Sequence, residues 1–268
     1  MSLGVAIKGP EGLVLAADSR VTLSVQHPNI PPLQINFDNA TKLLSFTEPP
    51  NFAGAVTYGT AVIELRTARS FIPELEEKVL ETKQERLTVE EYAGIISTFF
   101  QEQWHKVMPE DHSGPPMTFI VAGYGPDDAY GRVYLVNIPF DPDPVEQNPG
   151  ETNFGMTWGG QLSLVSRLIH GYDPALPAIL QKNLEIGDEE MNDLLQEIRQ
   201  SLEFQIPYQV LPLQDCVDLA TLLMRTTMDA QKLAVTVRGV GGLMELAVIT
   251  RTHGLDYIQR KSITINER

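Results

Sequence analysis

The chain begins with two apolar runs separated by a short polar turn. Leu3 to Lys8 and Leu13 to Ala17 are nearly continuous in apolar residues, and Gly9-Pro10-Glu11-Gly12 between them has the composition of a turn. This pattern predicts a β-hairpin. Because neither run alternates with polar residues, both strands are expected to be buried on two faces.

Helical periodicity follows in the first half of the chain. Apolar residues recur three and four positions apart over 60–80, and Pro73 within this stretch predicts a kink or a break. Thr88 and Glu91 have the spacing of a capping box, so a second helix is expected to begin there.

The rest of the chain alternates groups of strands with groups of helices. Strands are predicted at 42–46, 51–57, 117–123, 132–138, 154–158, 233–238 and 243–250, and further helices at 162–169, 188–204 and 213–229. The segment 24–39 is interpreted as a polar connection, and 139–150 as a proline-rich surface loop. Strands and helices that segregate in this way indicate an α+β architecture with antiparallel sheets.

The composition excludes several functions. The chain has 35 acidic and 20 basic residues and a formal charge of −15, without the clustered cations that bind nucleic acid or an anionic membrane surface. Its one cysteine, Cys216, excludes an internal disulfide framework and a cysteine-based zinc cage. No apolar stretch is long enough to span a membrane, and the first residues do not form a signal peptide. A cytoplasmic protein is expected.

Three residues could carry chemistry together. Removal of Met1 would leave Ser2 as the first residue, and the α-amine of a terminal hydroxyl residue can take the hydroxyl proton near neutral pH. Lys42 would keep that amine neutral by charge repulsion, and Asp18 would orient Lys42. The alternative is that Ser2 merely follows a start codon, while Asp18 caps a strand and Lys42 is solvated.

The stretch from Leu3 to Lys8 and from Gly12 to Thr22, around Ala16-Ala17-Asp18-Ser19-Arg20, resembles the N-terminal signature of proteasome β-type subunits, which are N-terminal-nucleophile hydrolases. The chain is therefore identified as similar to a bacterial or archaeal proteasome-like peptidase. The resemblance places Ser2 on the family's nucleophile and Asp18 on its aspartate, and Thr41-Lys42-Leu43 looks like the segment with the catalytic lysine. It implies a four-layer αββα sandwich in a single domain over 1–268, with a helical insertion around 176–206.

The resemblance also implies a function. Ser2 would hydrolyse an amide bond in a peptide or unfolded protein, the backbone N–H of Val56 would stabilise the oxyanion, and Gly54 would line the specificity pocket. No cofactor or metal is implied. A homo-oligomeric ring is expected, and an unfolding ATPase is a candidate partner.

The sequence departs from the family pattern at several supporting positions. The nucleophile is serine where the family has threonine, Val56 stands where glycine is usual, and Gly159 stands where a supporting serine is expected. The glycine-rich segment 239–242 lacks the family's Asp-x-x-Ser-Gly run and is interpreted as a turn. Two alternatives therefore remain: a catalytically inactive ring subunit, and an acylase or transpeptidase with a dedicated substrate.

Overall fold

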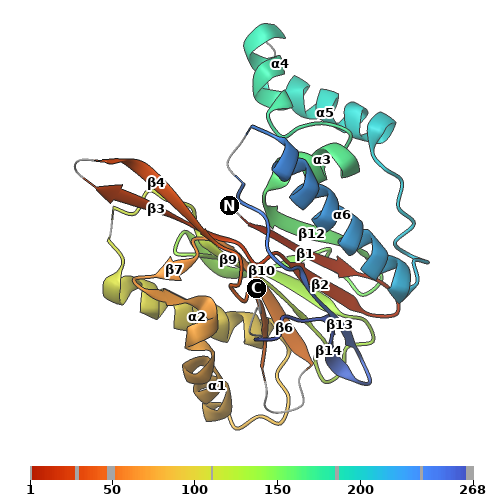
Figure 1. Ribbon diagram of the computed structural model, residues 1–268. Coiled ribbons are helices and arrows are strands. Elements are labelled where there is room, and N and C mark those ends of the chain that lie inside the picture. The colour runs from red at the N-terminus through yellow and green to blue at the C-terminus, as the bar shows by residue number, and fades with distance from the viewer. Residues whose placement is uncertain are drawn as a thin grey trace. The chain divides into compact units, whose positions relative to one another are not determined.

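The computed structural model describes residues 2–27, 30–46, 52–109, 111–184, 187–235 and 238–263 (Figure 1). The chain divides into two compact units, the first made of 1–160 with 208–268 and the second of 161–207. The second unit contains the segment that the sequence indicated as an insertion. A single domain over 1–268 stays a prediction.

The N-terminal hairpin lies in the middle of the first five-stranded sheet. Its strands run in the antiparallel order β12-β1-β2-β13-β14, with β1 at Leu3–Lys8, β2 at Leu13–Ala17, β12 at Gly155–Gly160, β13 at Glu245–Thr250 and β14 at Gly254–Gln259. Every residue of β1 and β2 is buried, which confirms that these two strands are covered on both faces.

The second sheet is also antiparallel. Its order is β11-β10-β9-β6-β5, with β5 at Leu43–Ser45, β6 at Ala53–Gly59, β9 at Met117–Gly123, β10 at Arg132–Ile138 and β11 at Asp141–Gln147. Apolar side chains of the two sheets meet in one buried cluster that includes Leu15, Val56, Ile120 and Ala247. The sheets therefore pack face to face.

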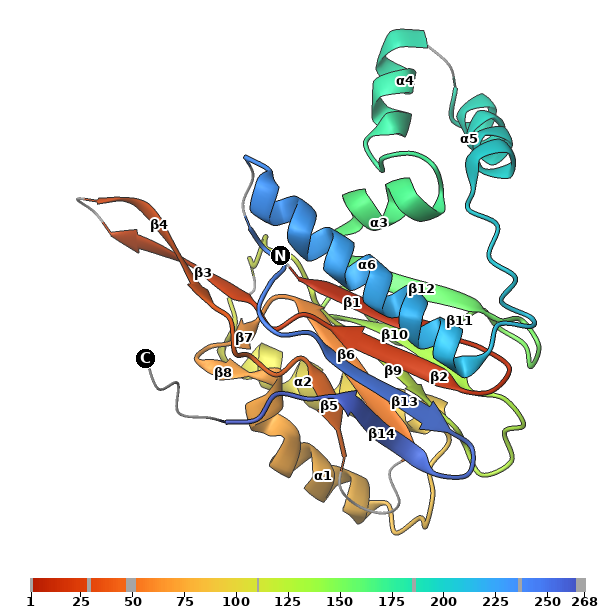
Figure 2. The same cartoon turned by 45° about the vertical axis from the view of Figure 1, so that its right-hand side comes forward.

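Helices cover the outer face of each sheet. The helix α6, Leu213–Leu233, packs on β1 and β2, while α1, Ile72–Glu81, and α2, Val89–Val107, cover the second sheet (Figure 2). The capping box of Thr88 and Glu91 is present at the start of α2. The predicted α+β sandwich of two antiparallel sheets between helices is thus confirmed.

The structure differs from the predicted helix over 60–80. The short strands β7, Val62–Ile63, and β8, Arg66–Thr67, come first, and a 3₁₀ turn, Ala68–Phe71, leads into α1. Pro73 lies in the first turn of α1. The N–H groups of a first turn have no intrahelical acceptor, so the missing N–H of proline costs no hydrogen bond there. Of the predicted kink or break, the kink is wrong and the break agrees with the structure, because α1 begins at Ile72.

Two segments interpreted as connections form strands. β11 lies within 139–150 as an edge strand, a position that tolerates Pro142 and Pro144 because its outer side needs no ladder donors. The strands β3, Val21–His27, and β4, Ile30–Phe37, form a separate hairpin (Figure 1). The strand predicted at 233–238 is not found: α6 continues to Leu233, and residues 236–237 lie outside the described residues.

The second unit consists of α3, Leu162–Ile169, α4, Leu176–Leu184, and α5, Asp188–Leu202. Within this unit Arg199 Nε donates to the hydroxyl of Tyr172 at 2.8 Å. The sequence predicted α3 and α5 as separate helices, and α4 falls within the helical insertion predicted around 176–206. Across the described residues of both units, none of the helices combines the length and the apolar character needed to cross a membrane.

Candidate active site

Asp18 follows the end of β2, and its buried carboxylate collects donors from three parts of the chain. Oδ1 accepts from Leu3 N at 3.1 Å, while Oδ2 accepts from Arg20 N at 3.0 Å and from Gly241 N at 3.1 Å. The backbone of three separate segments therefore fixes the position of the Asp18 carboxyl group at this strand end.

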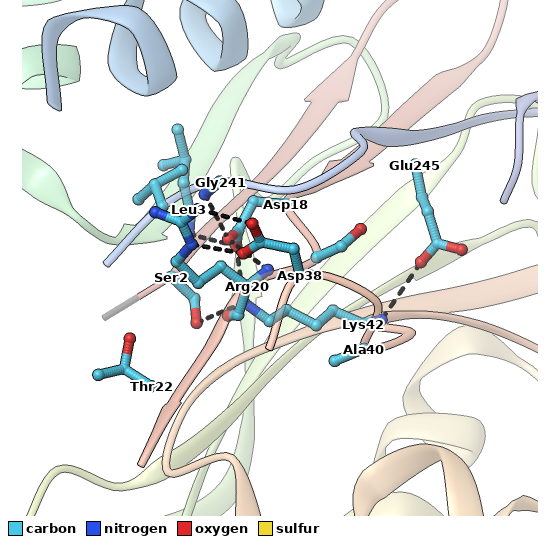
Figure 3. Close-up of polar contacts among 12 residues, drawn as sticks. Ser2, Leu3, Asp18, Arg20, Thr22, Asp38, Ala40, Lys42, Gly241 and Glu245 are labelled. Atoms are coloured by element: carbon cyan, nitrogen blue, oxygen red, sulfur yellow. Dashed lines mark hydrogen bonds and ion pairs between the residues drawn. The ribbon is translucent and has the colours of Figure 1, made fainter. Parts of the chain in front are cut away.

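Lys42 brings the matching positive charge (Figure 3). Its Nζ lies 2.8 Å from Ser2 Oγ and 2.8 Å from Asp18 Oδ1, and it also donates to the carbonyl oxygen of Arg20. Burial lowers the pKa of the Lys42 ammonium, and the Asp18 carboxylate opposes this change. Because three acceptors use its three protons, the charged form is fully hydrogen-bonded.

The backbone around Lys42 is fixed from the other sheet. Glu245, buried on β13, accepts from Lys42 N at 3.3 Å and from Leu43 N at 3.5 Å, and Lys261 Nζ donates to the Ala40 carbonyl. Burial raises the pKa of Glu245, while the positive charge of Lys261 lowers it. These contacts hold the start of β5, so the Lys42 side chain reaches Ser2.

A small cavity of about 20 Å³ lies beside Ser2 and Lys42. Its other walls come from the loop before Lys42, from the end of β6 and from the turn before α1, and they include Ala40, Thr57 and Ala68. A larger cavity of about 410 Å³ lies elsewhere, between α1 and α2, and neither Ser2 nor Lys42 lines it. Of these two cavities, the small one is thus the one that Ser2 lines.

The structure does not bring Val56 and Gly54 to this cavity. Thr57 N donates to Lys42 O at 3.0 Å, and the alternation of an antiparallel ladder then directs the N–H of Val56 toward β9, where Val56 pairs with Ile120. Gly54 lies between the sheets, where an added Cβ would lie 2.4 Å from Leu255 Cδ1. The oxyanion and pocket roles stay predictions, and no contact among the described residues supports them.

Sequence reasoning missed two groups that complete the site. Arg20 supplies both a carbonyl oxygen to Lys42 and an N–H to Asp18, and its guanidinium pairs with Asp38 at 2.5 and 2.7 Å. Gly241, in the segment interpreted as a plain turn, donates its N–H to Asp18. Arg20 could have been found from its position two residues after Asp18, whereas no sequence motif near Gly241 indicates its contact with Asp18.

Gly159 explains one departure from the family pattern. A Cβ at this position would lie 2.0 Å from Cζ and 2.1 Å from the hydroxyl of Tyr58, so the Tyr58 ring occupies the space that a serine would need. The replacement Gly159→Ser is therefore expected to lower the free energy of unfolding by about 1–3 kcal/mol, measured by urea denaturation. Combining it with Tyr58→Ala should remove most of that added cost. A Gly159→Ser protein as stable as the parent would contradict this assignment.

The described residues offer no metal centre. No group of three or more histidine, cysteine, aspartate or glutamate side chains gathers in a way that could hold an ion in this part of the chain. Around Ser2 the hydrogen-bonding side chain is that of Lys42, which in turn contacts Asp18.

Comparison with known proteins bears on the fold. The structure of the Gly-1 mutant of Anbu from Hyphomicrobium sp. strain MC1 is similar to this one, with a TM-score of 0.59 and 14% sequence identity. The match covers 99% of this chain and 88% of the Anbu chain. Anbu from Yersinia bercovieri, described as an ancestral beta-subunit, matches over 96% and 87% with a TM-score of 0.56 and 16% identity. The fold is proteasome-like. No protein-family model matches the chain, and neither does any curated protein.

These findings correct the family assignment made from the sequence. The N-terminal signature was identified with proteasome β-type peptidases, but the similar structures reported above are Anbu proteins, and no family model supports the assignment. At 14% and 16% identity, the likeness shows the fold alone. The N-terminal signature covers about twenty residues, most of them in buried strands. It therefore predicts the fold, but it does not distinguish one group of proteins with that fold from another.

Proposed function

We propose that this chain is an amide hydrolase of the N-terminal-nucleophile kind, in which Ser2 Oγ is the nucleophile once Met1 has been removed. One observation carries the proposal: the Lys42 ammonium is buried and lies 2.8 Å from both Ser2 Oγ and Asp18 Oδ1. A buried lysine between a hydroxyl and a carboxylate is a costly arrangement that function can explain.

The α-amine of Ser2 is the proposed base. Its ordinary pKa of about 7.7–8.0 is lowered by the positive charge of Lys42, so that the amine is neutral and can accept a proton at neutral pH. Asp18 holds Lys42 in place and balances its charge. Ser2 can then lose its hydroxyl proton without help from a distant residue.

The reaction would proceed in two steps, acylation of Ser2 and hydrolysis of the resulting ester. The Ser2 hydroxyl proton passes to the α-amine while Oγ bonds to the carbonyl carbon, and the carbonyl oxygen takes up the negative charge. When the tetrahedral intermediate collapses, the C–N bond breaks and the ammonium returns its proton to the leaving nitrogen. A water molecule then attacks the ester by the same route, which releases the acid and restores Ser2.

The remaining features of the proposal concern partners and location. A peptide or unfolded protein is the proposed substrate, and a homo-oligomeric ring is the proposed assembly. An ATPase partner and a cytoplasmic location stay predictions. The similar Anbu structures support the fold that such a protein needs, and no more than that.

The test is the intact mass of the untagged protein before and after exposure to a peptidyl epoxyketone. This electrophile reacts with the hydroxyl and the amine of the same terminal residue, so it reports both groups that the proposal needs. We expect loss of Met1 and one adduct on Ser2. The control Ser2→Ala, which keeps the amine but has no nucleophile, should fold normally and form no adduct.

Two outcomes lead to different conclusions. Retained Met1 without an adduct would contradict the proposal and favour a catalytically inactive structural member. An adduct on Ser2 without cleavage of generic peptides would keep the nucleophile and favour an acylase or transpeptidase with a dedicated substrate.

A further inference from the structure

A cavity that Ser2 does not line has three cations in its walls. Its volume is about 330 Å³, and Arg20, Lys232 and Arg238 contribute to its lining. Asp38 is the one acidic side chain among the described residues that line it. The whole chain has a formal charge of −15, so a cavity with more positive than negative charge in its walls stands out in this molecule.

The three cations come from separate places in the chain. Arg20 follows β2, Lys232 lies in the last turn of α6, and Arg238 precedes the glycine-rich segment 239–242. No run of basic residues indicates this group in the sequence, because only the fold brings its members together. Like charges repel, so a fold that gathers three of them creates a site that favours a bound anion.

Arg20 forms a fixed wall of the cavity. Its Nε and Nη2 donate to the Asp38 carboxylate at 2.5 and 2.7 Å (Figure 3), and its Nη1 donates to the carbonyl oxygen of Arg238 at 3.2 Å. An added Cβ at Gly241 would lie 2.6 Å from Arg20 Cζ, so the guanidinium lies against the bare backbone of this glycine. Since a guanidinium has five N–H groups, each Nη atom keeps one more donor in this ordered position.

The other two cations have donors to spare. Lys232 Nζ donates to Asp229 at 2.8 Å, and its other two protons have no acceptor among the described residues. Arg238 donates from Nη2 to the carbonyl oxygen of Lys232 at 3.0 Å, and its remaining N–H groups make no hydrogen bond within the described part of the chain. Lys232 and Arg238 are both exposed, so an anion from solvent can reach them.

Size and geometry restrict the anion. A volume of about 330 Å³ lies at the lower end of the range for cavities that hold small organic molecules, and Met228 and Val240 add apolar surface to the lining. Donors that come from three separate segments suit a phosphate group with three terminal oxygens better than a carboxylate with two. The charge of −15 opposes the approach of nucleic acid or of an anionic membrane.

We infer that this cavity binds the phosphate group of a small organic phosphate monoester, whose apolar part contacts Met228 and Val240. Arg20 supplies the fixed donors, and Lys232 and Arg238 supply the donors on the solvent side. Neither Ser2 nor Lys42 lines the cavity, so the inference does not rest on the proposed function.

The test is isothermal titration calorimetry of the full chain with phenyl phosphate as the probe, at constant ionic strength. We expect a Kd of about 1 mM or lower, and binding about 5- to 10-fold tighter than that of inorganic phosphate, which lacks the apolar part. Benzoate, which keeps the ring but has a carboxylate, should bind at least about 10-fold more weakly than phenyl phosphate. No binding of phenyl phosphate, or equal binding of benzoate, would overturn the inference.

Three variants assign the binding to this cavity. Arg238→Met and Lys232→Met should each weaken the binding of phenyl phosphate about 10-fold, because each removes a charged donor. Arg251→Met is the matched control: it makes the same change of charge at an exposed residue between β13 and β14 that does not line the cavity, and the affinity should stay nearly unchanged. An equal loss of affinity in Arg251→Met and Arg238→Met would mean that overall charge alone attracts the anion, and the assigned site would be wrong.

A peptide with one phosphoserine in its middle tests the size of the ligand. It carries the same phosphate group as a small monoester, but the chain on both sides of the phosphoserine exceeds the cavity. We therefore expect it to bind more weakly than phenyl phosphate in the same titration. Tighter binding of the peptide would show that the surface recognises a phosphorylated protein, and the assignment to a small molecule would be overturned.

Discussion

Replacing Lys42 with methionine is expected to lower the free energy of unfolding by about 3–5 kcal/mol. The Lys42 side chain is 6% exposed and that of Asp18 is 0% exposed, so the replacement leaves a buried carboxylate without its counter-charge. Methionine keeps a similar length and flexibility, which limits the loss of packing. Urea denaturation at pH 7 measures the change, and the adduct on Ser2 should disappear as well.

An exposed ion pair provides the control. Lys232 pairs with Asp229 at 2.8 Å, but both side chains are about two-thirds exposed, and Lys232→Met is expected to leave stability nearly unchanged. The double variant Lys42→Met with Asp18→Asn should be more stable than Lys42→Met alone, because the uncompensated charge is gone. A Lys42→Met protein that loses less than about 1 kcal/mol would show that the pair behaves like a surface pair.

The sequence predicted the fold where local pattern and long-range structure agree. The buried hairpin, the capping box of Thr88 and Glu91 and most of the strands follow from apolar periodicity and turn chemistry. β11 was missed because its prolines at 142 and 144 contradict strand propensity. The sheet tolerates these prolines because β11 is an edge strand. The edge position follows from the pairing of β11 with β10, which the sequence of 139–150 alone does not indicate.

The candidate site was predictable only in part. Ser2, Asp18 and Lys42 were singled out from the sequence, and the structure brings them within hydrogen-bonding distance, although their roles await the labelling test. The orientation of the Val56 N–H depends on the register between β5 and β6, a tertiary property that a motif does not fix.

The supporting groups illustrate the same limit. The family pattern led us to expect side-chain hydroxyls near the chain terminus, and their absence at Gly159 weighed against activity. In the structure the backbone N–H groups of Leu3, Arg20 and Gly241 surround Asp18 instead. Backbone donors carry no sequence signature, because every residue except proline has one. A comparison of residue types alone therefore misses the hydrogen bonds that backbone N–H groups supply to such a site.

Gly160 provides the second large effect, because it lies against the backbone of Ser2. Its φ is +92°, a conformation that L side chains rarely adopt, and an added Cβ would lie 2.0 Å from the carbonyl oxygen of Ser2. Gly160→Ala is expected to lower the free energy of unfolding by about 2–5 kcal/mol, the sum of about 1–2 kcal/mol for the backbone conformation and about 1–3 kcal/mol for the overlap.

A matched replacement at Gly150 separates the cost of the backbone conformation from the cost of the overlap. Its φ is +100°, but an added Cβ there meets nothing within 4 Å, so Gly150→Ala should cost only the conformational part, about 1–2 kcal/mol. Only Gly160→Ala should also slow adduct formation at Ser2, since relief of the overlap must move the Ser2 carbonyl and with it the hydroxyl that faces Lys42. Equal losses of stability in the two variants, with unchanged labelling in both, would mean that β12 yields at Gly160 and does not fix the position of Ser2.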